Sequence, residues 1–182
     1  IELTKIYRQK EAPFVHLLNK VRNNDMDAVD FELLHQRFHP DFRPGEGDNY
    51  ITLTSHNSQA DQINLREINK LLAKPFTYDA EITGDFPEHQ YPAEAALVLK
   101  EGAQVMFLKN DAAGRRYFNG KIGVVKHLDE EEVVVECDGM DIPVPKEAWE
   151  NTRYTISRTN GKLEQEMLGS FIQFPLRLAW AV

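Results

Sequence analysis

The chain has 182 residues, of which 42% are hydrophobic and 27% charged, with a formal net charge of −8 at pH 7. This length is enough for one large domain or two small ones. The single cysteine, Cys137, excludes an intramolecular disulfide and a zinc site made of several cysteines. No apolar run approaches the length that crosses a bilayer, and no signal peptide opens the sequence, so we expect a cytoplasmic protein with no membrane partner.

The first part of the chain alternates predicted strands and helices. Residues 1–6 alternate like a strand, and two helices are predicted next, one beginning near Pro13 and one over residues 27–38. Residues 50–54 predict a short buried strand, and residues 58–73 a long helix. The inward face of that long helix is predicted at Ala60, Ile63, Ile68, Leu71 and Leu72. This alternation is typical of an α/β domain.

Beyond Lys74 the sequence becomes β-rich. Residues 75–94 carry three prolines and little periodicity. The short β runs that follow are ALVLK, QVMFLKN, KIGVVKHL, EVVVEC, MDIPV and RYTISR. Closely spaced short strands predict a small barrel or sandwich, and its position between two α/β stretches predicts an inserted domain. The final QFPLRLAWAV is predicted to be a helix, with Pro175 in its first turn.

The charge is unevenly distributed. From Lys100 to Lys126 there are six basic and two acidic residues, a net charge of +4, which leaves −12 on the rest of the chain. Two interpretations are open. The stretch is a solvated hairpin, or it is a local nucleic-acid contact on an otherwise acidic protein.

Two apparent motifs are not supported by the rest of the sequence. GRRYFNGKI has five residues between Gly114 and Gly120, whereas a P-loop needs four, and Ile122 stands where a P-loop needs Ser or Thr. His35 and His39 lie four residues apart, as in some zinc sites, but nothing else in the sequence supports a metal centre. We therefore expect no metal site.

Tyr7 and Arg8 stand where a predicted strand gives way to a helix, a position that often presents functional side chains. Arginine binds phosphate through two parallel hydrogen bonds, and tyrosine can stack on a base. A structural role for this pair is the alternative.

Several segments, in order, resemble a known family. They are YRQ followed by PFVHLLNKVRN, then ITLTSHNSQADQIN, LKEGAQVMFLKND, YFNGKIGVV and QFPLRLAWAV. Together they resemble the C-terminal half of superfamily 1B DNA helicases, in the group containing the Pif and RecD proteins. The resemblance implies an α/β fold: an incomplete RecA-like domain of the P-loop NTPase type, residues 1–96 plus 170–182, with an inserted small all-β SH3-like barrel at residues 97–169.

The resemblance also implies that the chain is a fragment. In the family, the segment like PLRLAWAV runs into a Thr-x-His-Lys-Ser-Gln-Gly motif, and the P-loop and the Mg²⁺-binding motif lie in the preceding half. We therefore expect ATP and Mg²⁺ to be cofactors of the intact parent and none to bind the fragment. The expected partners are the missing N-terminal motor domain and, weakly, single-stranded DNA. Translocation from 5′ to 3′ and roles in DNA repair and recombination are expected by analogy alone.

Site residues follow from the same resemblance. Tyr7 and Arg8 match the motif beside the nucleotide, with the aromatic ring near adenine and Arg8 acting as an arginine finger on the γ-phosphate. His56 and Asn57 match a loop that faces single-stranded DNA.

In the predicted barrel, Asn110, Asn119 and Gly120 match the family signature, although the asparagines read first as turn formers. The basic residues expected to follow the DNA backbone are Lys109, Arg115, Arg116 and Lys121. The main alternative for the whole chain is a stand-alone nucleic-acid-binding or scaffolding module with no ATPase role.

Overall fold

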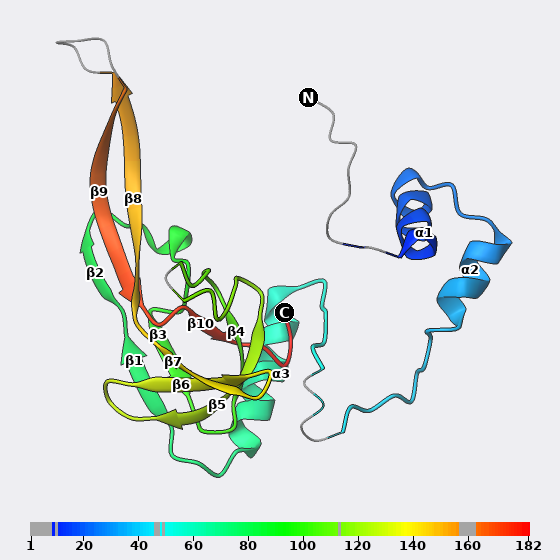
Figure 1. Ribbon diagram of the computed structural model, residues 1–182, viewed down its shortest axis with the longest axis horizontal. Helices are drawn as coiled ribbons and strands as arrows, with labels where there is room; N and C mark the ends of the chain where they lie inside the picture. Colours follow the sequence, from blue (N-terminus) through cyan, green and yellow to red (C-terminus); the bar gives the residue numbers. More distant parts are fainter. Residues whose placement is uncertain (1–8, 10, 46–47, 49, 113, 157–162) are drawn as a thin grey trace. The chain divides into compact units, whose positions relative to one another are not determined.

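The computed structural model describes residues 9, 11–45, 48, 50–112, 114–156 and 163–182. The chain divides into two compact units, residues 1–45 and 46–182 (Figure 1). Among the described residues, no helix is long and apolar enough to cross a membrane.

The first unit contains two helices, α1 (Ala12–Asn23) and α2 (Ala28–His35). A capping box starts α2: Asp27 accepts hydrogen bonds from the first turn, and Asp30 accepts one from the backbone N–H of Asp27. The Lys20 ammonium joins the two helices, lying 2.7 Å from Asp27 and 2.8 Å from Asp30. The two helices predicted here are confirmed, although the second is shorter than predicted.

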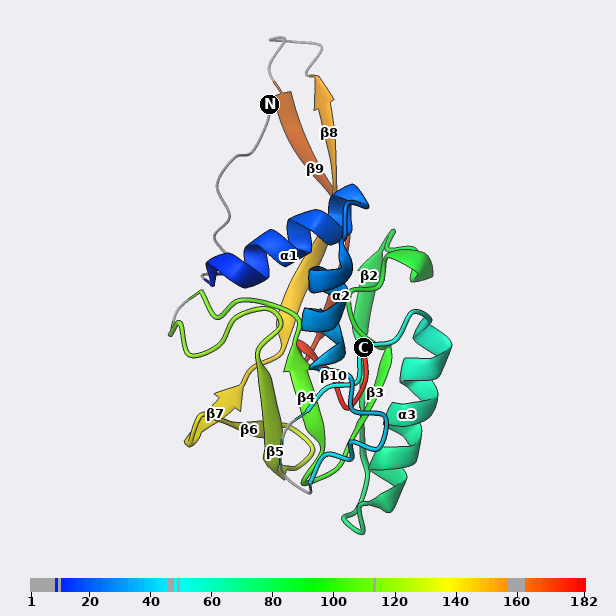
Figure 2. The same cartoon turned by 90° about the vertical axis from the view of Figure 1, so that its right-hand side faces the viewer.

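The second unit contains helix α3 (Asn57–Lys70), a short 3-10 turn (Glu88–Gln90) and antiparallel sheets. Its strands are β1 (Phe76–Asp79), β2 (Glu81–Gly84), β3 (Ala96–Leu99), β4 (Gln104–Phe107), β5 (Ile122–Leu128), β6 (Val133–Cys137), β7 (Met140–Val144), β8 (Glu147–Ile156), β9 (Leu163–Gln173) and β10 (Leu176–Leu178). One sheet has the order β10-β4-β5-β6-β7, a second β2-β9-β8, and a third pairs β1 with β3. In Figures 1 and 2 the paired β8 and β9 extend as a ribbon beyond the end of β2. The prediction of an α/β chain with a β-rich portion is confirmed.

One hydrophobic core lies beneath these sheets. It includes fully buried side chains from β3, β4 and β6, among them Leu97, Phe107 and Val135. In β6 the burial alternates along the strand, so one face meets the core and the other is partly solvated. Phe174 and Leu176 close the same core from the C-terminal segment.

The predicted C-terminal helix is wrong, because the segment forms strand β10. Leu176 pairs with Phe107 and Leu178 with Val105 in an antiparallel register. Short apolar runs do not distinguish helix from strand by periodicity alone. Here the free edge of β4 decides the outcome, since pairing with it supplies hydrogen-bond partners for a buried backbone.

Two details of the α/β portion also differ from prediction. Residues 50–54 do not form a buried strand: they make one parallel bridge, Thr52 to Ala181, and Leu53 is 81% exposed. Helix α3 ends at Lys70, so Leu72 falls outside it and is fully exposed rather than inward. The buried face of the helix instead includes Asn64.

Strand pairing crosses the predicted borders of the insertion. Strands β1 and β2 pair with β3 and β9, and β10 pairs with β4. The division into residues 1–96 plus 170–182 and 97–169 stays a prediction.

Candidate nucleic-acid interface

Two regions of the second unit carry the predicted DNA-binding residues. The predicted nucleotide-binding pair, Tyr7 and Arg8, lies outside the described residues. Its role therefore stays a prediction.

The first region is the start of α3. His56 is the N-cap residue in extended conformation and Asn57 is the first helical residue. The His56 ring nitrogen Nδ1 lies 2.9 Å from the Ser55 hydroxyl, and the Thr54 hydroxyl donates to the His56 carbonyl at 3.0 Å. In the described structure no side chain caps this helix, so its first N–H groups and its positive dipole end face outward.

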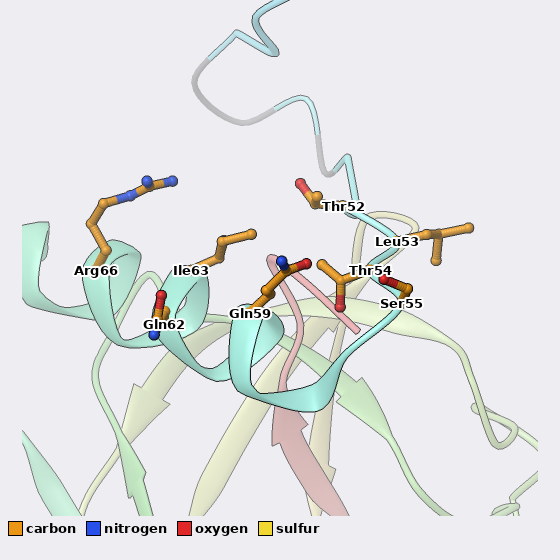
Figure 3. A pocket seen from close by; sticks show the side chains of 8 residues that line it. All are labelled: Thr52, Leu53, Thr54, Ser55, Gln59, Gln62, Ile63 and Arg66. Carbon is orange, nitrogen blue, oxygen red and sulfur yellow. The ribbon is translucent and has the colours of Figure 1, made fainter.

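An open groove of about 840 Å³ lies beside this helix start (Figure 3). One wall is residues 52–55, and the other is formed by side chains of α3. His56 and Asn57 connect the two walls in the chain without lining the groove. The lining residues are Thr52, Leu53, Thr54, Ser55, Gln59, Gln62, Ile63 and Arg66. This mixture of hydroxyl, amide and guanidinium groups can donate hydrogen bonds to phosphate oxygens.

The second region is the connection between β4 and β5, which Asp111 organises. The Asp111 carboxylate accepts hydrogen bonds from the Gly114 N–H at 2.8 Å and from the Arg116 Nε at 2.7 Å. These bonds, that of Gly114 first, lower the pKa of Asp111 to about 2. Asn110 acts in the same way, since its side-chain oxygen accepts the Asn119 N–H at 2.8 Å. Asn119 and Gly120 form a turn, as their sequence predicts, whereas Asn110 lies outside it and holds it through this hydrogen bond.

The four predicted basic contacts are not equivalent. Lys109 binds Glu147 at 3.0 Å and lies 5.1 Å from the Trp149 ring centre, and the Lys121 side chain is only 13% exposed and binds Asp138 at 2.9 Å.

The two arginines are better placed for DNA. Arg115 is exposed with φ 52°, and within the described residues no side-chain hydrogen bond or ion pair holds it. Arg116 is 41% exposed and uses Nε for Asp111, so its terminal nitrogens can still bind phosphate.

Sequence reasoning missed three buried amides that hold the C-terminal segment. Asn64 exchanges two hydrogen bonds of 2.9 Å with the Ala181 backbone. Gln104 donates to the carbonyls of Ala179 and Tyr50, and Gln173 to that of Tyr78. The sequence does indicate that Asn64 is buried, because Asn64 lies midway between the apolar positions 60 and 68 on one helix face.

Metal binding has no support in the described residues, where no group of three or more His, Cys, Asp or Glu side chains could hold an ion. The sequence also lacks a P-loop. The expectation that the fragment binds neither ATP nor Mg²⁺ stays a prediction.

The chain resembles proteins of one family along its whole length. No family model matches it. The human ATP-dependent DNA helicase PIF1 is 31% identical over 194 residues, which cover 100% of this chain and 28% of that protein. For Pif1 of Bdellovibrio bacteriovorus the identity is 26%, covering 100% of this chain and 40% of that protein. The chain thus spans well under half of the curated relatives it matches.

Crystal structures agree. Bacteroides Pif1 in complex with ADP-AlF4 matches with a TM-score of 0.89 and 34% identity, over 100% of this chain and 41% of that one. The same protein bound to single-stranded DNA matches with a TM-score of 0.68 at the same identity. By sequence and by fold, the chain belongs to the Pif1-like helicases of superfamily 1B and corresponds to part of their length.

Proposed function

We propose that the chain is part of an ATP-dependent DNA helicase, in which it supplies the second motor domain and an SH3-like barrel that bind single-stranded DNA. One observation carries this proposal: the whole chain matches Bacteroides Pif1 at 34% identity and a TM-score of 0.89. That relative has also been crystallised with single-stranded DNA. A cytoplasmic location belongs to the proposal and agrees with a chain that has one cysteine.

The proposed DNA surface has two parts. At the start of α3, the groove beside His56 and Asn57 offers hydroxyl and amide donors and the helix N-terminus to phosphates. On the β4–β5 connection, Arg115 and Arg116 supply positive charge. Because the rest of the chain is strongly acidic, the affinity of the chain alone should be weak.

The nucleotide-binding part of the proposal concerns Tyr7 and Arg8. In the complete helicase, Arg8 would contact the γ-phosphate of ATP and stabilise the charge that develops during phosphoryl transfer, with Tyr7 beside the adenine. Mg²⁺ and the β-phosphate would be held by the other motor domain, which contains the P-loop. A reading frame that continues past Val182 into Thr-x-His-Lys-Ser-Gln-Gly would distinguish this proposal from a stand-alone module.

Fluorescence anisotropy of a labelled single strand, titrated with the chain across a salt series, tests the DNA-binding function. Binding should weaken as salt rises, with a slope of about −0.7 per phosphate contacted. Arg115→Glu should weaken it further, and this variant leaves the Asp111 hydrogen bonds intact.

Arg153→Glu is the matched control, because Arg153 is also exposed and lies on the β8–β9 ribbon, where it pairs with Glu166. Binding that ignores salt, or that responds equally to both charge reversals, would contradict the proposed surface.

A further inference from the structure

Phe118 is exposed beside a buried aromatic neighbour. Tyr117 is 3% exposed and its ring stacks on Phe107, with ring centres 4.0 Å apart and an angle of 15° between the planes. The next residue, Phe118, is 61% exposed. An exposed phenyl ring beside a stacked, anchored pair gains nothing from core packing.

The backbone around Phe118 is held on both sides. On one side, the Asn119 N–H donates to Asn110, and on the other the Tyr117 carbonyl accepts the N–H of Asp111 at 3.1 Å. The Gly120 N–H donates to the Phe107 carbonyl at 2.8 Å. The ring is therefore presented by an ordered turn, which lowers the entropy cost of using it to bind a ligand.

A groove of about 370 Å³ lies against this ring. Its floor includes Gly123, where a Cβ atom would come within 2.4 Å of a Val135 methyl and 2.5 Å of the Cys137 sulfur. Gly120 has φ 92°, and a Cβ there would meet no atom within 4 Å, so the space above it is open. The groove is partly open to solvent and has an aromatic ring in its lining.

The charge of the groove selects the kind of group it can receive. Lys121 is paired with Asp138, and the Glu136 carboxylate lies 3.7 Å from the Lys126 ammonium, so the charged groups of the lining already have partners of opposite charge. Such a groove suits a neutral, planar base better than a phosphate. The positive charge for phosphates lies instead on Arg115 and Arg116 of the same connection.

We propose that Phe118 is a stacking platform for one nucleobase of a single strand, which lies in this groove while the neighbouring phosphates contact the two arginines. The inference rests on the proposed DNA-binding function and assigns it a base contact. Aromatic rings stack on every base, so the contact should be tolerant of sequence.

The test uses the 182-residue chain and single strands that carry 2-aminopurine at successive positions. Stacking should quench 2-aminopurine at a limited set of positions for the unmodified chain and for Phe118→Tyr. Phe118→Ala and Phe118→Leu should lose that quenching and bind about tenfold more weakly, because a stacked base contributes roughly 1–3 kcal/mol. Leucine keeps an apolar side chain and lacks only the π face, which separates stacking from folding.

Tyr154→Ala is the matched control, since Tyr154 is 62% exposed on the β8–β9 ribbon. It should bind like the unmodified chain. If DNA binds in a salt-dependent and Arg115-dependent way but all Phe118 variants behave alike, the stacking inference is overturned and the DNA-binding function stands. If neither the unmodified chain nor any variant binds DNA, the stacking inference and the DNA-binding function are both overturned.

Discussion

Replacing Asn64 by alanine should destabilise the second unit strongly. Asn64 is 5% exposed, and its amide satisfies both the N–H and the C=O of Ala181, which is fully buried. Alanine would leave both backbone groups without these partners. A buried polar group that loses its partner costs about 1–3 kcal/mol, and the better helix propensity of alanine returns at most about 0.7 kcal/mol. Because two backbone groups lose their partners, the expected loss in the free energy of unfolding is about 1–5 kcal/mol.

Urea unfolding followed by tryptophan fluorescence measures this loss, and a thermal melt should show a Tm lower by roughly 2–20 °C for a chain of this length. Asn69→Ala is the control: it makes the same chemical change in the same helix at an exposed position. If the two variants unfold within about 0.5 kcal/mol of each other, the Asn64 bonds do not anchor the C-terminal segment, and the packing described above is refuted.

Two further predictions concern charge and catalysis. The Asp111 carboxyl, with a folded pKa near 2 against an ordinary 3.8, should stabilise the β4–β5 connection fully above pH 3.8 and lose that effect as pH falls towards 2; NMR titration should find it ionised at pH 3, and Asp111→Asn should abolish this acid dependence. The chain alone should not hydrolyse ATP even with single-stranded DNA present, because it lacks a P-loop; turnover that survives repurification and disappears in Arg8→Ala would contradict this.

The sequence predicts helices and strands well where an apolar pattern repeats over a long segment or where turn residues separate short strands. Helices α1 to α3 and the order of β3 to β8 follow from their patterns of apolar residues and turns. The C-terminal segment could not be predicted in this way, since its apolar residues fit both a helix and a strand. The edge of β4, about 70 residues earlier in the chain, determines its conformation.

The candidate site was predicted only in outline. Lys109 and Lys121 were predicted as DNA contacts because they are basic. The sequence does not reveal that each already has an acidic partner in the fold. Phe118 was overlooked because an aromatic residue next to Tyr117 in a β-rich stretch is expected to be buried in the core. Which of the two faces inward depends on the register of the turn, which three-dimensional structure alone reveals.

The most direct test of the central claim is ATP turnover by the full-length protein that contains this chain, with Arg8 replaced by alanine. Arginine fingers contribute about three to five orders of magnitude to turnover in related phosphoryl transfers, so DNA-stimulated hydrolysis should fall by at least about a hundredfold, with nucleotide affinity changed much less. Arg8→Lys should restore little, since it keeps the charge but loses the planar guanidinium. A melting curve on the same variants reports whether they fold. Near-normal turnover in a well-folded Arg8→Ala protein would contradict the claim that this chain is the second motor domain of a helicase.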